Sequence, residues 1–411
     1  MTISSTEFTA MLKENFTKDA IKDLARRKDR FRTMIQKNTK VGGEDYKVPV
    51  INAYSARRSC DFVTAQTTIA DNTGYQAFKM TLAQDYAVAS WTGKVLKQTE
   101  GDENAFARVM KSEMDRAIRA AYRSQAIKLF RTGTGSVATI NSGATVASLT
   151  ITLANVADAQ NFEVGEQVGA SATDGGALRG SPSYVTISAI DRSLGSLSTT
   201  GSNWSAQIAS LAVGDTLFKR GDAQNNGTKV AIEGWLSFGP AASTALSSAF
   251  YNVTRSTDQS RLACLFKDNT TDQKPIDEFL VDCVSEILAN GSDPDFAFLN
   301  PRKYRVLINR AQTKLVRSDN KKAQVGFGAV ELLCDDGVLP VYSDVNCPEP
   351  NVMMGQMDTW ELVSPGESIG ILEDDKQEIL RVYNADSYEV RIGGYPQLAN
   401  HAPGFNLTGI V

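Results

Sequence analysis

Histidine, the side chain that most often serves in acid–base catalysis, occurs only once in these 411 residues, as His401. A Ser-His-Asp or Cys-His mechanism could use only that residue, and zinc motifs that need two histidines cannot be built. We assign no catalytic residue. A binding or structural protein is therefore a better prediction than an enzyme.

The five cysteines offer no alternative chemistry. Their number is odd, they are widely scattered, and no Cys-x-x-Cys pair occurs, so neither a zinc site nor a thioredoxin-like redox centre is supported. We interpret them as reduced thiols in a cytoplasmic protein, with Cys283 packed on the apolar stripe of a predicted helix. The five are Cys60, Cys264, Cys283, Cys334 and Cys347.

Clusters of acids and glycines could bind a cation or a phosphate, but none has the required pattern. The three acids at Glu373, Asp374 and Asp375 rarely converge on one ion when adjacent, so a solvated turn is the better interpretation. The loop from Gly133 to Gly135 lacks the third glycine and the following helix of a nucleotide-binding fingerprint. We therefore predict no cofactor and no metal.

The composition is that of a folded protein, and the length suggests two or three domains. Hydrophobic residues make up 42% and charged residues 22%, and the formal net charge is -4, so the total does not favour wrapping nucleic acid. The N-terminus lacks the basic and apolar runs of a secretory signal. No apolar stretch approaches the roughly 18 residues of a membrane-spanning helix.

Residues 1–40 are expected to begin with an amphipathic helix. They hold ten Lys or Arg against five Asp or Glu, and their apolar residues recur at spacings of three and four. A basic stretch from Arg26 to Arg32 follows. Two interpretations stay open: a solvated helix face, or an arm that docks on another subunit. The apolar stripe consists of Phe8, Met11, Leu12, Phe16, Ile21 and Leu24.

Residues 41–98 are expected to form a long β-hairpin. A strand-like run that begins at Tyr46 contains Pro49, which removes one ladder donor and favours an exposed ribbon over a central strand. After a polar stretch, the residues from Phe78 to Leu82 alternate between apolar and polar, which is the period of a half-exposed strand. A lone hairpin cannot bury its surface, so this one needs a partner.

The strongest local pattern is a single helix over residues 102–131. Its apolar residues form one continuous stripe without Gly or Pro, Asp102 can cap its start, and Gly133 lies just past its end. At roughly 1.5 Å per residue, the helix would be about 45 Å long. A helix of this length can serve as a stiff spine.

Residues 133–218 differ sharply in composition. They contain no lysine, two arginines, eleven glycines and 23 Ser or Thr, and short β-rich runs recur. We predict a small all-β insertion, a sandwich or a barrel, in an otherwise mixed chain. Residues 162–168 and 211–217 are similar to each other. An internal repeat and two unrelated turns both remain open.

The remainder of the chain returns to a mixed pattern. A helix is expected to begin at Pro275 and to end at Asn290 and Gly291, and a buried strand at Phe296 runs into a helix that starts at Pro301. Further strands are predicted over residues 338–342 and 351–355, and a hairpin over residues 377–384 and 387–393.

In this order, the elements resemble the major capsid proteins of tailed bacteriophages, whose Hong Kong 97 fold is shared with encapsulin compartments. Residues 129–135 and 226–235 resemble the stretch after the family's spine helix, and Phe298 to Pro301 with Tyr304 resembles a strand-to-helix step of its axial domain. The implied fold class is α+β. The implied domains are an N-terminal arm (1–40), an extended β-hairpin loop (41–98), the spine helix of a peripheral domain (99–135), an all-β insertion domain (136–222), and an axial domain with the remaining peripheral strands (223–411).

The resemblance implies a structural protein and not an enzyme. Its copies would form pentamers and hexamers of an icosahedral shell around double-stranded DNA, without sequence-specific binding, in the virion and, during assembly, in the host cytoplasm. A separate scaffolding protein and a portal are implied as partners, and no membrane is. Some relatives cross-link a lysine to an asparagine, but no local feature selects Lys47 or Lys79 in the hairpin, so we predict no cross-link. The alternatives are an encapsulin-type compartment and, less favoured, a β-rich decoration or adhesin protein.

Overall fold

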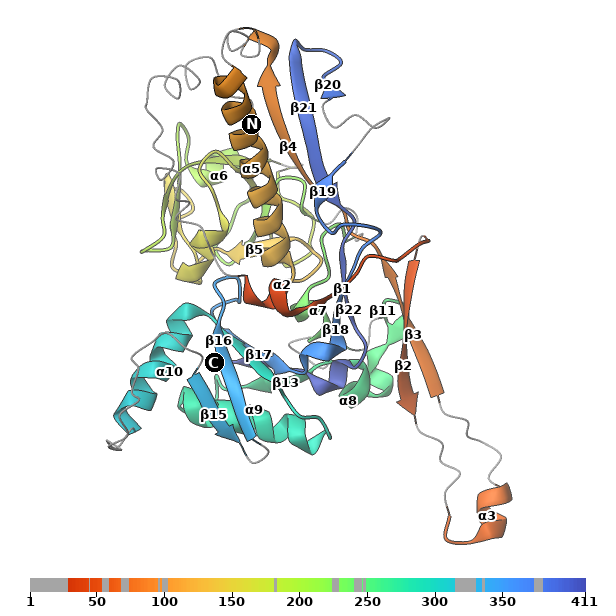
Figure 1. The fold of residues 1–411 in the computed structure, drawn as a ribbon. Coiled ribbons are helices and arrows are strands. Elements are labelled where there is room, and N and C mark those ends of the chain that lie inside the picture. Colours follow the sequence, from red (N-terminus) through yellow and green to blue (C-terminus); the bar gives the residue numbers. More distant parts are fainter. Residues whose placement is uncertain are drawn as a thin grey trace, which may run out of the picture.

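The computed structural model shows two α/β bodies, a β-rich unit and a projecting two-stranded ribbon (Figure 1). The residues that the structure describes are 29–43, 45–53, 59–67, 74–94, 97, 103–180, 183–223, 229–239, 246, 249–314, 330–334, 337–372 and 380–411.

The first body, here called the mixed body, is a six-stranded sheet with two helices. The strand order is β13-β23-β17-β14-β16-β15, with β13 parallel to β23 and β14 parallel to β16. Helix α9 buries an apolar stripe that includes Cys283, as predicted, and ends at Asn290 and Gly291, where φ is +83°. The strands are β13 (Leu265–Asp268), β14 (Phe296–Leu299), β15 (Val330–Cys334), β16 (Gly337–Ser343), β17 (Asn351–Gly355) and β23 (Leu407–Ile410), and the helices are α9 (Ile276–Ala289) and α10 (Pro301–Lys314).

The second body, here called the spine body, is built on the predicted long helix, α5 (Glu103–Lys128). The helix packs against strands β4 (Asp85–Thr92) and β21 (Ser387–Gly394), which are antiparallel partners. Ala117 and Ala121 of the helix meet Trp91 in a shared apolar cluster. Strand β21 also pairs with β19 (Gly370–Ile371) and β20 (Leu380–Arg381), so the predicted C-terminal hairpin is confirmed.

The ribbon consists of the antiparallel strands β2 (Asp45–Ala53) and β3 (Gly74–Thr81), and it carries the short helix α3 (Phe62–Thr67) at its far end (Figure 1). The predicted hairpin is thus confirmed, with Pro49 in a two-stranded ribbon where one side of the strand is unpaired. Strand β4, although within the expected 41–98 segment, is not part of the ribbon. It pairs with β21 because its apolar face packs on α5.

Residues 29–40, expected to belong to an intersubunit arm, are part of the subunit's own fold, and Phe31 and Ile35 lie in its core. Helix α2 (Arg30–Met34) buries Phe31 completely, and β1 (Gln36–Asn38) pairs parallel with β18 (Trp360–Val363). Removal of residues 1–35 would therefore take Phe31 and Ile35 out of this core. The stripe of Phe8, Met11, Leu12, Phe16, Ile21 and Leu24 lies outside the described residues.

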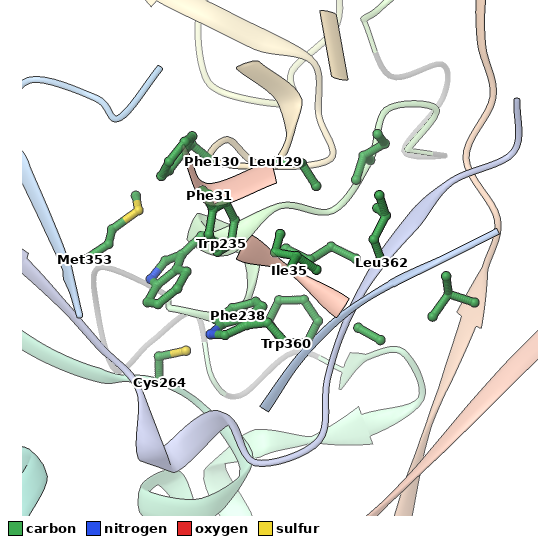
Figure 2. Packing of buried hydrophobic residues seen from close by; sticks show 14 of the residues in the cluster. Phe31, Ile35, Leu129, Phe130, Trp235, Phe238, Cys264, Met353, Trp360 and Leu362 are labelled. Carbon is green, nitrogen blue, oxygen red and sulfur yellow. The ribbon is translucent and has the colours of Figure 1, made fainter. Parts of the chain in front are cut away.

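An aromatic cluster, here called the central core, joins the two bodies (Figure 2). The Phe31 ring lies 5.0 Å from that of Phe130 and 5.6 Å from that of Phe298, measured between ring centroids. Trp235 and Trp360 stack at 4.2 Å. Because Phe130 follows the long helix and Phe298 lies on β14, one buried cluster fixes the spine body relative to the mixed body.

Short elements complete these parts of the chain. They are α7 (Trp235–Phe238), β11 (Ala249–Phe250), β12 (Val253–Thr254), α8 (Gln259–Leu262), β22 (Gln397–Asn400) and the 3-10 turns Arg255–Thr257, Met357–Thr359 and Pro403–Phe405.

The β-rich segment, here called the β unit (residues 136–219), has a sheet and an apolar cluster of its own. The strand order is β5-β10-β7-β8-β9-β6, and a bridge between Ile140 and Leu153 joins the two outer strands, so the sheet closes into a barrel. Its elements are β5 (Ser136–Thr139), β6 (Thr150–Thr152), the 3-10 helix η1 (Val156–Asn161), β7 (Gln167–Ser171), β8 (Val185–Asp191), β9 (Ser196–Thr199), α6 (Trp204–Gln207) and β10 (Thr216–Lys219).

Candidate functional site

The single histidine takes part in a structural linkage. His401 Nε2 lies 2.9 Å from Glu361 Oε2, and the same carboxylate oxygen accepts a hydrogen bond of 3.1 Å from the Tyr46 hydroxyl. Glu361 lies on β18 and Tyr46 on β2, so these contacts tie the base of the ribbon to the central core.

The buried cysteines are held in their unreactive form. Burial raises the pKa of Cys283 to about 12 and also raises the pKa of Cys264 and Cys347 above the ordinary thiol value. Since the thiolate is the reactive species, these three side chains serve as packing. Cys60 is exposed. Among the described residues, no group of three or more His, Cys, Asp or Glu side chains could hold a metal ion.

The glycine loop after α5 is filled by the protein's own carboxylate. The Gly133 N–H donates to Glu233 Oε2 at 3.2 Å, and a Cβ added to Gly133 would lie 2.5 Å from the Glu233 side chain. A phosphate would need that same space and would meet a negative charge. The acids Glu373 to Asp375 lie outside the described residues.

A cavity of about 840 Å³ lies where the base of the ribbon meets the chain that leaves the β unit. Its carboxylates and Lys229 already have partners of opposite charge. Lys128 Nζ lies 3.2 Å from Asp85 Oδ1 and 3.1 Å from Asp222 Oδ1, and Lys229 Nζ lies 2.6 Å from Glu233 Oε1.

Burial raises the pKa of Asp85, an effect that Lys128 opposes. Burial also lowers the pKa of Lys128, but Asp222 and Asp85 outweigh this, so the pKa of the lysine is raised and its charge is retained. Lys128, held between the two carboxylates, joins β4, α5 and the chain just after the β unit. This is a structural ion-pair network rather than an acid–base pair.

The ribbon exposes apolar side chains that the subunit does not cover. Near its base, Phe78 and Val48 are buried in the central core. Farther out, the cross-strand partners Ile51 and Tyr75 are 39% and 67% exposed. At the far end, in α3, Phe62 is 78% exposed and Val63 is 62% exposed.

These side chains were missed at the level of sequence, because Phe62 and Val63 stand between the first predicted strand and the polar stretch 67–73, where no element was predicted. Only its position at the end of a projecting ribbon makes it a candidate contact surface (Figure 1).

Comparison with known proteins identifies solved structures that share this fold. No family model and no curated protein matches the sequence. Among solved structures, the fold is that of a phage capsid protein. The chain matches the cyanophage A-1(L) capsid asymmetric unit over 97% of its own length and 96% of that chain, with a TM-score of 0.53 and 7% identity.

Other solved structures are similar at TM-scores below 0.5. They include the holo-SrpI encapsulin complex from Synechococcus elongatus PCC 7942 (TM-score 0.47, 8% identity, 99% of this chain and 96% of that one) and Mycobacterium phage Ogopogo (TM-score 0.46, 6% identity, 99% of both chains).

Proposed function

We propose that this chain is a major capsid protein, whose copies assemble into an icosahedral shell around a double-stranded DNA genome. The observation that carries the proposal is the uncovered apolar surface of a ribbon that projects from the subunit, in a chain with the fold of a phage capsid protein. Exposed apolar side chains that gather on a projecting element mark a site of protein–protein contact. In a closed shell, the partner is a neighbouring copy.

The same proposal assigns roles to the parts of the fold. The ribbon is the extended loop, α5 is the spine helix of a peripheral domain, and the mixed body is the axial domain. The β unit is an insertion domain. Residues 1–28 are the intersubunit arm, shortened from 1–40 because the segment from Asp29 onward belongs to the subunit.

In this proposal, the ribbon and the arm supply the contacts between subunits. The ribbon adds area by strand and side-chain contact, and an amphipathic arm adds area by helix docking. A separate scaffolding protein and a portal are the proposed further partners, and DNA is enclosed without sequence-specific contact. The proposed locations are the virion and, during assembly, the host cytoplasm. No helix among the described residues is long and apolar enough to span a membrane.

The test is light scattering and negative-stain electron microscopy of the purified protein, alone and after co-expression with a scaffolding protein. We expect pentamers, hexamers or closed shells of uniform diameter. A strictly monomeric protein at high concentration under both conditions would overturn the proposal. The contents of the shells distinguish a genome container from a compartment loaded with protein.

A further inference from the structure

The strand pairing of the β unit is unchanged when its two halves are exchanged. The first half contains β5, β6 and β7, and the second contains β8, β9 and β10. The pair β5·β10 corresponds to β8·β7, and the bridge between Ile140 and Leu153 corresponds to the pair Ile187–Thr199 of β8 and β9. The pairs β6·β9 and β7·β10 correspond to themselves.

The hydrogen bonds correspond residue by residue. In each half, an isoleucine exchanges two backbone bonds with a glycine and the acid after it, and these two residues lie in the other half. The Gly214 N–H donates to the Ile140 carbonyl at 3.2 Å, and the Ile140 N–H donates to the Asp215 carbonyl at 2.8 Å. In the same way, the Gly165 N–H donates to the Ile187 carbonyl at 2.8 Å, and the Ile187 N–H donates to the Glu166 carbonyl at 3.0 Å.

The two similar sequence runs are the same turn. Gly165 has a φ of +89° and Gly214 a φ of +81°, a conformation that glycine adopts without strain. The acid after each glycine accepts a hydrogen bond from the backbone N–H three residues earlier. The Glu163 N–H donates to Glu166 at 2.9 Å, and the Ala212 N–H donates to Asp215 at 2.8 Å. Two unrelated turns would not share both this turn and its strand partners.

The first half supplies acids and a carbonyl that bind arginines of the long helix and of the chain just beyond it. Arg123 of α5 bonds to Glu163 and to the Gln160 carbonyl, and Arg131, just beyond α5, bonds to Asp158. The Asp158 side chain is 4% exposed and that of Arg131 is 13% exposed, so this pair lies inside the interface. The apolar cluster of the β unit contains only residues of the unit itself, so charge and hydrogen bonds hold it in place.

The second half lacks these acids at the corresponding positions. Ala212 corresponds to Glu163 within the shared turn. Asp158 stands three residues after Asn155, the residue that precedes η1, and Ala206 stands three residues after Asn203, which caps α6. Asp158 and Glu163 are therefore acids of the first half whose equivalent positions in the second half are alanines.

We infer that the β unit is an internally duplicated barrel with a pseudo-two-fold axis. Asp158 and Glu163 make its first half the docking surface for Arg123 of α5 and for Arg131 just beyond it. The axis passes between Ile151 and Leu197 on one side of the barrel and between Gly169 and Phe218 on the other, since both pairs correspond to themselves. The barrel can be placed on the subunit in two ways, and the acids select one of them.

The test exchanges the two halves in the full chain. Residues 185–219 are placed first and residues 136–171 second, with the loop 172–184 kept between them. Hydrogen exchange of barrel peptides reports folding, and exchange of the α5 peptides around Arg123 reports docking. We expect a protected barrel, with α5 exchanging at least about tenfold faster because the acids now face away from it.

A second exchanged chain adds Ala206→Asp and Ala212→Glu, which should restore the protection of α5. An unprotected barrel in both exchanged chains would overturn the duplication. Equal protection of α5 with and without the two added acids would overturn the docking role.

The natural-order chain provides an independent measurement. Asp158→Asn with Glu163→Gln should speed exchange at α5 and leave the barrel protected. The control is Asp191→Asn, an exposed acid of the same unit that bonds within its own turn, and it should change neither. An unaltered α5 in the double variant would also contradict the docking role.

Discussion

The ribbon and the β unit are both built from β-strands and both extend from the two bodies, but one is incomplete and the other is complete. The ribbon has two strands, and past its base the apolar pair of Ile51 and Tyr75 is exposed to solvent. The β unit closes its sheet into a ring and buries large side chains such as Trp204 and Phe162 completely. An open two-stranded ribbon needs a partner, whereas a closed barrel satisfies its own edges.

The difference shows that exposure alone does not identify a contact surface. The β unit also has exposed apolar residues, including Leu194 at 69% and Val164 at 54%. These stand singly in turns of a closed barrel, and scattered exposed side chains are normal in any protein. Phe62 and Val63 are adjacent in sequence, and their helix lies at the far end of a ribbon whose two strands pair only with each other (Figure 1). This position on a projecting element is what makes them candidates for a subunit contact.

The largest expected effect comes from the tip of the ribbon. Phe62→Ser with Val63→Ser should abolish closed shells and leave the melting temperature of the isolated subunit unchanged, because neither side chain is buried in the subunit. The matched control is Val164→Ser with Leu194→Ser, which removes similar exposed apolar area from the β unit. The control should form normal shells. Electron microscopy and calorimetry check both.

The base of the same ribbon should behave in the opposite way. Phe78 is fully buried against Phe238 and Phe250, so Phe78→Ala should lower the stability of the subunit by about 3–5 kcal/mol. Similar stabilities for the Phe78 and Phe62 variants would contradict the contrast between a buried base and an exposed tip of the ribbon.

A second prediction concerns the independence of the β unit. Trp204 is fully buried and donates from Nε1 to the Leu149 carbonyl at 3.1 Å. Trp204→Ala should destabilise the β unit by about 3–5 kcal/mol, and hydrogen exchange should accelerate only within residues 136–219. The matched variant Trp235→Ala, in the central core, should instead accelerate exchange in both bodies. Global acceleration in the Trp204 variant would mean that the β unit is not independent.

The sequence predicted the elements that have a strong period or composition. The long helix, the ribbon, the β-rich unit and the helix that ends at Gly291 were each visible locally. The path of residues 29–40 was not visible, because Phe31 is buried by rings that lie 99 or more positions away, at Phe130, Phe298 and Trp360. The duplication was only suggested, since the equivalent strands pair through registers that no single run of sequence reveals.

A third, smaller effect is a pH dependence of stability that we expect in the two bodies and not in the β unit. Asp344 accepts hydrogen bonds from the backbone N–H groups of Arg30 and Phe31, and burial raises its pKa to about 6. An unfolded Asp has a pKa of about 3.9, so between about pH 4 and pH 6 the folded state binds a proton that the unfolded state does not. This group therefore makes the bodies less stable as the pH rises through that window.

The size of this effect is about 2–3 kcal/mol, from roughly two units of pKa shift. Asp344→Asn should remove it, so that the stability of the wild type relative to the variant should rise as the pH is lowered from 7 to 4. Exchange within the β unit should show no such difference, because Asp344 lies outside it. A difference curve that is flat, or that has the opposite sign, would contradict this role of Asp344.

The smallest effect is expected from removing the whole β unit. Its two ends are adjacent, since a Cβ added to Gly135 would lie 1.9 Å from the Asp222 carbonyl oxygen, so a short Gly/Ser linker can replace residues 136–219. Its apolar cluster stays within the unit, so excision opens no cavity in the bodies. Arg123 and Arg131 lose their acids, but removal of the unit also exposes both guanidinium groups to water, so no charge is left buried without a partner.

Deletion of half of the β unit should therefore destabilise the protein more than deletion of the whole unit. Deletion of residues 136–171 alone leaves three strands of a ring, whose buried faces and strand edges have no partners. We expect the whole-unit deletion to remain soluble, to melt within a few degrees of the wild type and to assemble, and the half-unit deletion to aggregate. If the half-unit deletion were tolerated and the whole-unit deletion were not, the β unit would belong to the core of the subunit, and the contrast with the ribbon would fail.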